Sequence, residues 1–253
     1  MTEPLRGITM LAACTEDRAP DLAARLRALG AQVLEVPTIR IARPKDFGPL
    51  DRALRTRTPF DWIVFTSGHG VRAFVARARE IGIDRRTVGK RIATVGPATA
   101  AAGRRAGLRV DFTPAQFLTA AIAEGLGPLE GRRVLLPRAD IARRSLADAL
   151  RARGATVRAV VAYRTVPAER PRSANPLDEV DVVVFTSASA ARGLDRMLGP
   201  EAEPLKRRAS AACIGPVTAE AARALGYDVR VVANEYTIPG LLASLVREVG
   251  RHG

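Results

Sequence analysis

The chain has 253 residues, of which 47 % are hydrophobic and 26 % are charged, a composition typical of a folded globular protein with one large or two modest domains. No stretch approaches the roughly 18 consecutive apolar residues of a membrane helix, and the N-terminus lacks the pattern of an export signal, so we expect a soluble cytoplasmic protein with no membrane partner. The formal net charge is +14, but arginine is spread over nearly every predicted helix and aromatic residues make up only 4 %. This distribution argues against a nucleic-acid partner and indicates either solvated helix surfaces or a small polyanion held in a cleft.

Cysteine and histidine are too sparse to predict a metal site. Cys14 and Cys213 lie in apolar runs, where we expect small buried thiols and no disulfide. His69 and His252 are the only histidines, and neither has a second ligand at metal-binding spacing. Dinucleotide-binding and Walker-type glycine loops are absent, and a Ser-His-Asp hydrolase has no well-placed histidine. We therefore expect no metal site.

The first half of the chain alternates between apolar runs, which predict buried strands, and stretches with leucine at helical spacing. Glycines separate the two kinds, as where Gly30 ends the first helix. In chain order we predict a strand at 7–13, a helix at 20–29, a strand at 32–36 with an extended continuation to 44, a helix at 47–55, a strand within 61–67, a helix from about 71, a strand at 92–95, a helix from 96 to about 107, a strand at 108–112 and a helix at 117–126.

The second half repeats this order. The segment Asp61–Ser67 returns nearly unchanged as Asp181–Ser187, an offset of 120 residues, and Gly30 and Gly154 stand 124 residues apart. In chain order we predict a strand at 134–137, a helix at 144–153, an extended run at 156–166, a strand within 181–187, a helix at 190–198, a strand at 211–214, a helix from 215 to 225, a strand at 229–232 and a helix at 238–249. The steady offset indicates two homologous β-α units, each a parallel sheet covered by helices.

Two extended segments, at 38–43 and 163–167, are too long for buried strands and end at a proline. We interpret them as a connector between two domains. If they pair, residues 1–37 and 168–253 form one composite domain, and residues 38–167, connector strands included, form the other. The predicted fold class is therefore α/β, with two parallel-sheet domains, a two-stranded β connector and an active-site cleft between the domains.

Four predicted helix starts follow strand ends, where ligands bind in open parallel sheets. Two of them place hydroxyls at the N-cap and two place proline in the first turn with a hydroxyl shortly after. They are Thr66-Ser67-Gly68, Thr186-Ser187-Ala188, Gly96-Pro97-Ala98-Thr99 and Gly215-Pro216-Val217-Thr218. Helix capping explains each one alone. Two sets that face each other would present backbone N–H groups and helix dipoles to carboxylates or phosphates.

Two further motifs lie between these pairs: Leu-x-Pro-Arg at Leu135–Arg138 and Ala-Tyr-Arg-Thr at Ala162–Thr165. With them, the order of motifs resembles the uroporphyrinogen-III synthase family over essentially the whole chain. The resemblance implies two α/β domains on a two-stranded connector, a monomer, and catalysis without a cofactor. The implied substrate is hydroxymethylbilane, a linear tetrapyrrole with carboxylate arms on every ring, and the enzyme that makes it is an implied upstream partner.

The resemblance also implies a reaction. The terminal hydroxyl leaves, the far ring attacks the resulting azafulvene to form a spiro intermediate, and rearrangement closes uroporphyrinogen III with that ring inverted. Tyr163 matches the family's functional tyrosine, whose phenol, with a pKa of about 10, can donate a hydrogen bond to the departing hydroxyl. The alternative is a connector tyrosine that packs one domain on the other.

The remaining site residues follow from the same match. Thr99 and Thr218 match threonines that contact the substrate, and Arg138 either meets a carboxylate or is a surface cation. The cleft is expected to be lined by Thr66, Ser67, Gly68, Thr186, Ser187, Ala188 and Gly215.

The chain departs from the family pattern at its first strand. Many members continue there as Thr-Arg-Pro, whereas here Cys14-Thr15-Glu16-Asp17 follows, so an arginine contact is missing and Arg18 is a candidate substitute. His69, between two glycines, is a second local variation without an assigned role. A function from another class stays open, namely a two-domain receptor or sensor that closes around a small anion without turnover.

Overall fold

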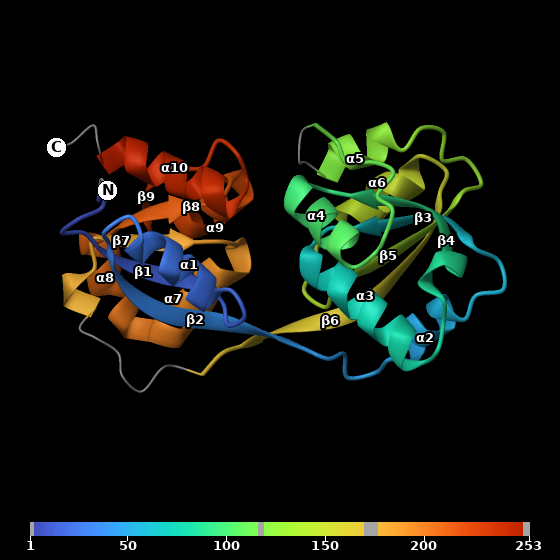
Figure 1. Ribbon diagram of the computed structural model, residues 1–253, viewed down its shortest axis with the longest axis horizontal. Helices are drawn as coiled ribbons and strands as arrows, with labels where there is room; N and C mark the ends of the chain where they lie inside the picture. Colours follow the sequence, from blue (N-terminus) through green and yellow to red (C-terminus); the bar gives the residue numbers. More distant parts are fainter. Residues whose placement is uncertain (1–2, 116–118, 170–176, 250–253) are drawn as a thin grey trace. The chain divides into compact units, whose positions relative to one another are not determined.

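The computed structural model in Figure 1 describes residues 3–115, 119–169 and 177–249. The chain divides into two compact units, which we call the composite unit and the middle unit. The composite unit runs to Arg40 and resumes at Val166, and the middle unit is Ile41–Thr165. Neighbouring strands pair in parallel in each unit, and this confirms the predicted parallel α/β fold.

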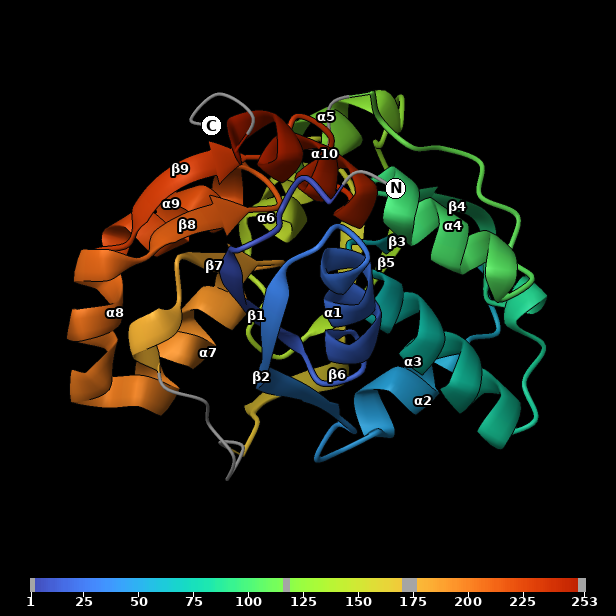
Figure 2. The ribbon, with the colours of Figure 1, turned by 60° about the vertical axis from the view of Figure 1, so that its left-hand side comes forward.

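The composite unit has a central sheet between two helix layers (Figures 1 and 2). Its strands lie in the order β2-β1-β7-β8-β9 and are β1 (Thr9–Thr15), β2 (Gln32–Ala42), β7 (Val182–Phe185), β8 (Ser210–Cys213) and β9 (Asp228–Val232). Its helices are α1 (Ala19–Arg27), α7 (Ala188–Leu198), α8 (Ala202–Arg208), α9 (Pro216–Ala224) and α10 (Ile238–Val249). Alternate residues of β1 enter different cores: Leu11 packs with α7, α8 and α9, and Met10 packs with α1 and α10.

The middle unit has the same layered construction. Its strands lie in the order β4-β3-β5-β6 and are β3 (Phe60–Phe65), β4 (Gly89–Thr94), β5 (Arg133–Ala139) and β6 (Thr156–Pro167). Its helices are α2 (Gly48–Leu54), α3 (Gly68–Glu80), α4 (Pro97–Arg105), α5 (Thr119–Gly125) and α6 (Ser145–Ala152). Phe65 packs with α2 and α3 on one face, and Val64 packs with α5 and α6 on the other. Short 3₁₀ turns complete the described part of the chain, at Arg85–Thr87, Leu177–Glu179 and Gly199–Glu201.

The chain passes between the units in β2 and β6, the longest of the described strands, because the boundaries at Arg40/Ile41 and Thr165/Val166 fall inside them. On the composite side, the N–H of Ala168 donates to the carbonyl of Thr38 (3.2 Å). The buried Thr38 hydroxyl donates in turn to the carbonyl of Ala190 on α7 (3.2 Å). A Cβ at Gly193 would lie 3.0 Å from the Thr38 carbonyl oxygen, so only a glycine lets α7 approach the connector this closely.

The two copies of the repeated segment hold their neighbouring strands in the same way. Asp61 Oδ2 accepts the N–H of Arg133, the first residue of β5 (3.0 Å), and Asp181 Oδ2 accepts the N–H of Thr9, the first residue of β1 (2.9 Å). The Arg133 N–H, and next the Lys90 ammonium, hold the pKa of the Asp61 carboxyl below its usual range. The repeat therefore preserves a strand-capping contact as well as an apolar strand.

The predicted strand at 108–112 is wrong. Among the described residues only one bridge forms there, between Ala93 and Phe112. The physical reason is Asp111, whose Oδ2 accepts the N–H of Ile92 (2.8 Å) in place of a strand carbonyl. The Asp111 side chain thus prevents a full strand here, whereas β9 pairs along β8 in the composite unit.

The helix predictions differ from the structure at three places. The sequence analysis missed α8, whose Pro204 lies in the first turn, where proline is tolerated. Helix α3 begins at Gly68 and α7 at Ala188, two or three residues before the predicted starts. The predicted helix at 117–126 is described from Thr119 on, and its first two residues lie outside the described residues, as do His252 and the segments 170–176 and 250–253 of the predicted composite domain.

Candidate functional site

Ser67 caps α3 at the carboxyl end of β3. Its backbone is extended, and its Oγ accepts the N–H of Gly70 (3.1 Å), which confirms the predicted N-cap. The glycines around it allow close packing of this helix start. A Cβ at Gly68 would lie 3.2 Å from the Cβ of Ala102 on α4, and one at Gly70 would lie 3.1 Å from the carbonyl oxygen of Pro137 on β5. Thr66 is exposed immediately before the cap.

Tyr163 reaches this helix start from β6. Its side chain is buried, with 8 % of its surface exposed, and its hydroxyl lies 2.9 Å from Ser67 Oγ. Its ring centroid lies 5.8 Å from the imidazole of His69, one residue into the helix. Both contacts are inside the middle unit. The tyrosine is therefore held in the core of that unit with its phenol at the N-terminus of α3.

The second helix start of the middle unit is adjacent to the first, because the N–H of Val95 donates to the carbonyl of Phe65 (3.0 Å). Gly96 is the extended N-cap of α4 and Pro97 its first residue, as predicted. Thr99 is buried, with 8 % of its surface exposed. A threonine hydroxyl in such a place can still form hydrogen bonds with a ligand.

Arg138 lies at the carboxyl end of β5 and is partly exposed. One of its guanidinium N–H groups donates to the carbonyl of Arg143 (3.2 Å), which orders the loop before α6. Because a guanidinium carries five N–H donors, this single bond leaves most of its capacity to bind an anion.

The composite unit repeats the two helix starts without the tyrosine. Ser187 caps α7 by accepting the N–H of Ala190 (3.1 Å), as predicted, and Thr186 and Ala188 beside it are partly exposed. The Ser187 hydroxyl also lies 3.1 Å from the Ser189 hydroxyl, whereas the Ser67 hydroxyl contacts a phenol. The two caps are thus equivalent in structure but not in chemistry.

The other helix start of the composite unit is at Gly215. The N–H of Ile214 donates to the carbonyl of Phe185 (3.0 Å), as the corresponding groups do in the middle unit. Gly215 is extended, and a Cβ there would lie 3.2 Å from the ring of Tyr236. Thr218 is buried, with 5 % of its surface exposed.

The structure therefore gathers the predicted site residues into two groups, each at the carboxyl edge of one sheet. The middle unit holds Thr66, Ser67, Gly68, Thr99, Arg138 and Tyr163, and the composite unit holds Thr186, Ser187, Ala188, Gly215 and Thr218. The cleft between the domains stays a prediction. Arg18, the candidate substitute for the missing arginine, lies at the start of α1, just beyond the carboxyl end of β1.

The cysteines contribute no chemistry to these edges. Cys14 and Cys213 are buried free thiols, as predicted, and burial raises the pKa of each to about 12. Within the described part of the chain, no three His, Cys, Asp or Glu side chains are grouped so that they could hold a metal ion. No helix among the residues described is both long enough and apolar enough to cross a membrane.

The two serine caps allow a matched experiment. Ser67→Ala and Ser187→Ala each remove one N-cap hydrogen bond, so we expect each to lower the free energy of unfolding by about 1 kcal/mol. Only Ser67→Ala also removes the partner of the Tyr163 hydroxyl. Catalytic activity should therefore fall more in Ser67→Ala than in Ser187→Ala at equal stability. Chemical denaturation and turnover assays on both variants measure this difference. Equal activity of the two variants would show that the contact between Ser67 and Tyr163 does not affect turnover.

Comparison with known proteins gives a consistent result. The model of a family described as uroporphyrinogen-III synthase HemD matches residues 20–243. The uroporphyrinogen-III synthase of Synechococcus elongatus is 32 % identical over 253 residues, which cover 96 % of each chain. A putative uroporphyrinogen-III synthase of Methanothermobacter thermautotrophicus is 29 % identical and covers 92 % of this chain and 96 % of its own.

Solved structures show the same fold. A mutant uroporphyrinogen III synthase from the extremely thermophilic bacterium Thermus thermophilus superposes with a TM-score of 0.70 at 22 % identity, over 98 % of this chain and 100 % of that one. The enzyme of Helicobacter pylori superposes with a TM-score of 0.62 at 17 % identity, over 95 % of this chain and 99 % of that one.

Proposed function

The chain belongs to the uroporphyrinogen-III synthase family and cyclises hydroxymethylbilane to uroporphyrinogen III, and we propose that Tyr163 starts this reaction as the hydrogen-bond donor to the leaving hydroxyl. The observation that carries the proposal is the contact of 2.9 Å between the Tyr163 hydroxyl and Ser67 Oγ at the start of α3. A phenol is protonated at neutral pH. It can therefore give its proton to the departing oxygen while Ser67 and the helix N-terminus stabilise the phenolate.

The reaction then proceeds by the substrate's own reactivity. The C–O bond of the hydroxymethyl group breaks, water leaves with the donated proton, and an azafulvene remains. The terminal D ring attacks this electrophile through its substituted α-carbon and forms a spiro intermediate. Reopening and reclosure invert that ring, and loss of a proton restores the tyrosine and gives the product. Because the bilane also closes without inversion when unassisted, the protein contributes chiefly by holding one conformation of a flexible chain.

The helix starts supply binding groups for the carboxylate arms. Backbone N–H groups at the beginnings of α3, α4, α7 and α9 are suited to anions. Hydroxyls at the same places can add hydrogen bonds, and Arg138 can meet a carboxylate with two N–H groups. We assign substrate contacts to Thr66, Ser67, Gly68, Thr99 and Arg138 in the middle unit and to Thr186, Ser187, Ala188, Gly215 and Thr218 in the composite unit.

Apolar surface at the same edges suits the pyrrole rings. Ile141, just after β5, and Val217, in the first turn of α9, are 54 % and 55 % exposed, and they are the exposed large hydrophobic side chains of the described residues. Each unit thus presents one such side chain where its sheet ends. A substrate with apolar rings and charged arms can use both kinds of surface.

We also infer the cellular setting. The bilane is unstable, so a cytoplasmic monomer that takes it directly from the enzyme that produces it would limit unassisted closure. The net charge of +14 supports rapid capture of a polycarboxylate, because opposite charge raises association rates.

Turnover separates this function from that of a receptor. Purified protein is mixed with freshly made hydroxymethylbilane, and ring closure is followed after oxidation of the product to the coloured porphyrin. The proposal predicts closure well above the protein-free rate. A receptor would instead show ligand-dependent thermal stabilisation with closure at the spontaneous rate, and that result would overturn the proposal.

A further inference from the structure

A cavity of about 390 Å³ lies beside Tyr163, inside the middle unit. It is formed by the end of β2 and the segment that leads from it to α2, by one side of α3 and by β6. Apolar atoms of Ile41, Phe47, Ala76 and Ala162 form part of its wall. The cavity falls within the range of roughly 300–1,000 Å³ that is usual for small-molecule pockets, and it suits one pyrrole ring with its arms.

Paired charges lie where the segment after β2 and the C-terminal part of α3 line this cavity. Arg77 donates two hydrogen bonds to Asp51 (2.7 and 2.6 Å), and Arg43 contacts both carboxylate oxygens of Glu80 (2.8 Å each). The ring of Phe47 lies within 4.8 Å of the Arg43 guanidinium and 4.2 Å of the Arg77 guanidinium. These contacts fix the segment after β2 on α3 and hold the pKa of Asp51 below its usual range through the Arg77 hydrogen bonds.

The end near Tyr163 has different chemistry. Arg72 Nη2 lies 2.6 Å from His69 Nδ1. Because a guanidinium can only donate, Nδ1 must be the acceptor, and the imidazole proton is on Nε2. In this arrangement the Nε2–H of His69 is the ring's donor, and Arg72 brings a full positive charge next to it. The His69 ring is in turn beside the ring of Tyr163.

We propose that His69 and Arg72 bind one carboxylate arm of the bilane at this cavity and so position the ring that carries the hydroxymethyl group against Tyr163. The inference rests on the proposed function and names a subsite of the same site. A carboxylate has two oxygens. One can accept the Nε2–H of His69 and the other an N–H of Arg72, while the apolar wall receives the edge of the pyrrole ring.

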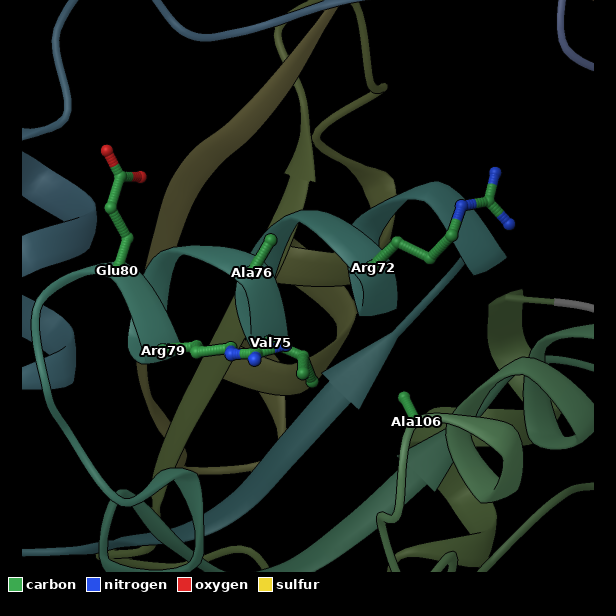
Figure 3. Close-up of a pocket in the computed structure, with 6 residues that line it drawn as sticks. All are labelled: Arg72, Val75, Ala76, Arg79, Glu80 and Ala106. Atoms are coloured by element: carbon green, nitrogen blue, oxygen red, sulfur yellow. The ribbon is translucent and has the colours of Figure 1, made fainter.

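The helix that carries this pair also supplies a matched control. A second hollow along α3, of about 600 Å³, is lined by Arg72, Val75, Ala76, Arg79, Glu80 and Ala106. Figure 3 shows these residues. In that view Arg72 extends away from one end of the helix, whereas Arg79 and Val75 lie on the side of the helix toward Ala106. Arg79 is exposed and does not line the cavity beside Tyr163. Arg79→Gln thus removes one arginine charge from α3 without touching the proposed subsite.

Steady-state kinetics with hydroxymethylbilane tests the pair. Arg72→Gln and His69→Ala are each expected to raise KM about tenfold, the loss of one charge-assisted or buried hydrogen bond, with kcat changed by less than about threefold. His69→Gln should recover most of the affinity, because its amide can donate from nearly the position of Nε2. Arg79→Gln should keep the wild-type KM. Equal KM values for Arg72→Gln and Arg79→Gln would overturn the inference.

A second readout needs no variant. His69 is one of two histidines, so its imidazole nitrogens can be resolved by ¹⁵N NMR of the whole protein. We expect the Nε2–H tautomer, and a shift of the His69 signals on addition of uroporphyrin III, which has eight carboxylates, larger than with coproporphyrin III, which has four. Unchanged His69 signals would contradict the subsite. If the wild-type protein does not accelerate ring closure, the proposed function fails. If it does accelerate closure but the Arg72 and His69 variants keep the wild-type KM, only this inference fails.

Discussion

Tyr163→Phe is expected to lower kcat by about 10²- to 10⁴-fold, the usual contribution of a positioned proton donor, while the protein stays folded. The change removes one hydroxyl and keeps the ring, which packs in the core of the middle unit. Loss of the hydrogen bond with Ser67 should lower the free energy of unfolding by only about 1 kcal/mol. Activity should therefore fall far more than stability, as measured by turnover and by denaturation of the same sample.

Tyr227→Phe is the matched control. The Tyr227 hydroxyl is buried in the composite unit without a hydrogen-bond partner in the described part of the chain, and burial raises its pKa. Its ring contacts Phe185 edge-on at 5.0 Å, and phenylalanine keeps that contact. We expect unchanged turnover and equal or higher stability. If Tyr163→Phe kept the wild-type kcat, Tyr163 would have no part in the mechanism.

Phe185→Ala is expected to cost about 3–5 kcal/mol, because it leaves a cavity where a fully buried ring was. The position of the damage is as informative as its size. Phe185 is the last residue of β7, which pairs directly with β1. Hydrogen exchange should therefore speed up in residues 9–36, far away in sequence, together with residues 182–232, whereas residues 60–139 of the middle unit keep their protection.

Phe65→Ala provides the reverse test. Phe65 is the equivalent residue of β3 and packs edge-on against Phe74 of α3 at 5.4 Å. Loss of its ring should speed up hydrogen exchange in residues 60–139 and leave residues 9–36 protected. This pair of variants tests the assignment of the N-terminal β-α segment to the composite domain. Loss of protection at 9–36 in Phe65→Ala, but not in Phe185→Ala, would contradict that assignment.

The capping chemistry could be predicted from the sequence because it is local. Ser67 and Ser187 cap the helices that follow them. Gly154 has a positive φ (84°) directly after the C-cap of α6, and Gly30 (94°) has one in the turn that follows α1. The parallel sheets also followed from the repeat. The caps depend on a few adjacent residues, and the sheets on a pattern that recurs 120 residues later in the chain.

Contacts between distant residues were not predictable in the same way. Ser67 and Tyr163 were both expected in the site, yet their hydrogen bond joins residues 96 positions apart. Similarly, the strand expected at 108–112 was lost to one aspartate that pairs with β4.

The cavity beside Tyr163 depends both on a local pattern and on contacts between distant residues. His69 and Arg72 are three residues apart, a spacing that places them on one helix face and that the sequence analysis did not use. The cavity itself also needs Arg43 and Phe47 to fold back on α3. That arrangement depends on tertiary packing, which no local pattern signals.

The isomer composition of the product tests the account most directly. Purified protein and hydroxymethylbilane are allowed to react to completion, the uroporphyrinogen is oxidised, and the type I and type III porphyrins are separated by chromatography. Inversion of the D ring by this protein predicts predominantly type III, against type I in the protein-free control. Type I alone in the presence of active, folded protein would contradict the account.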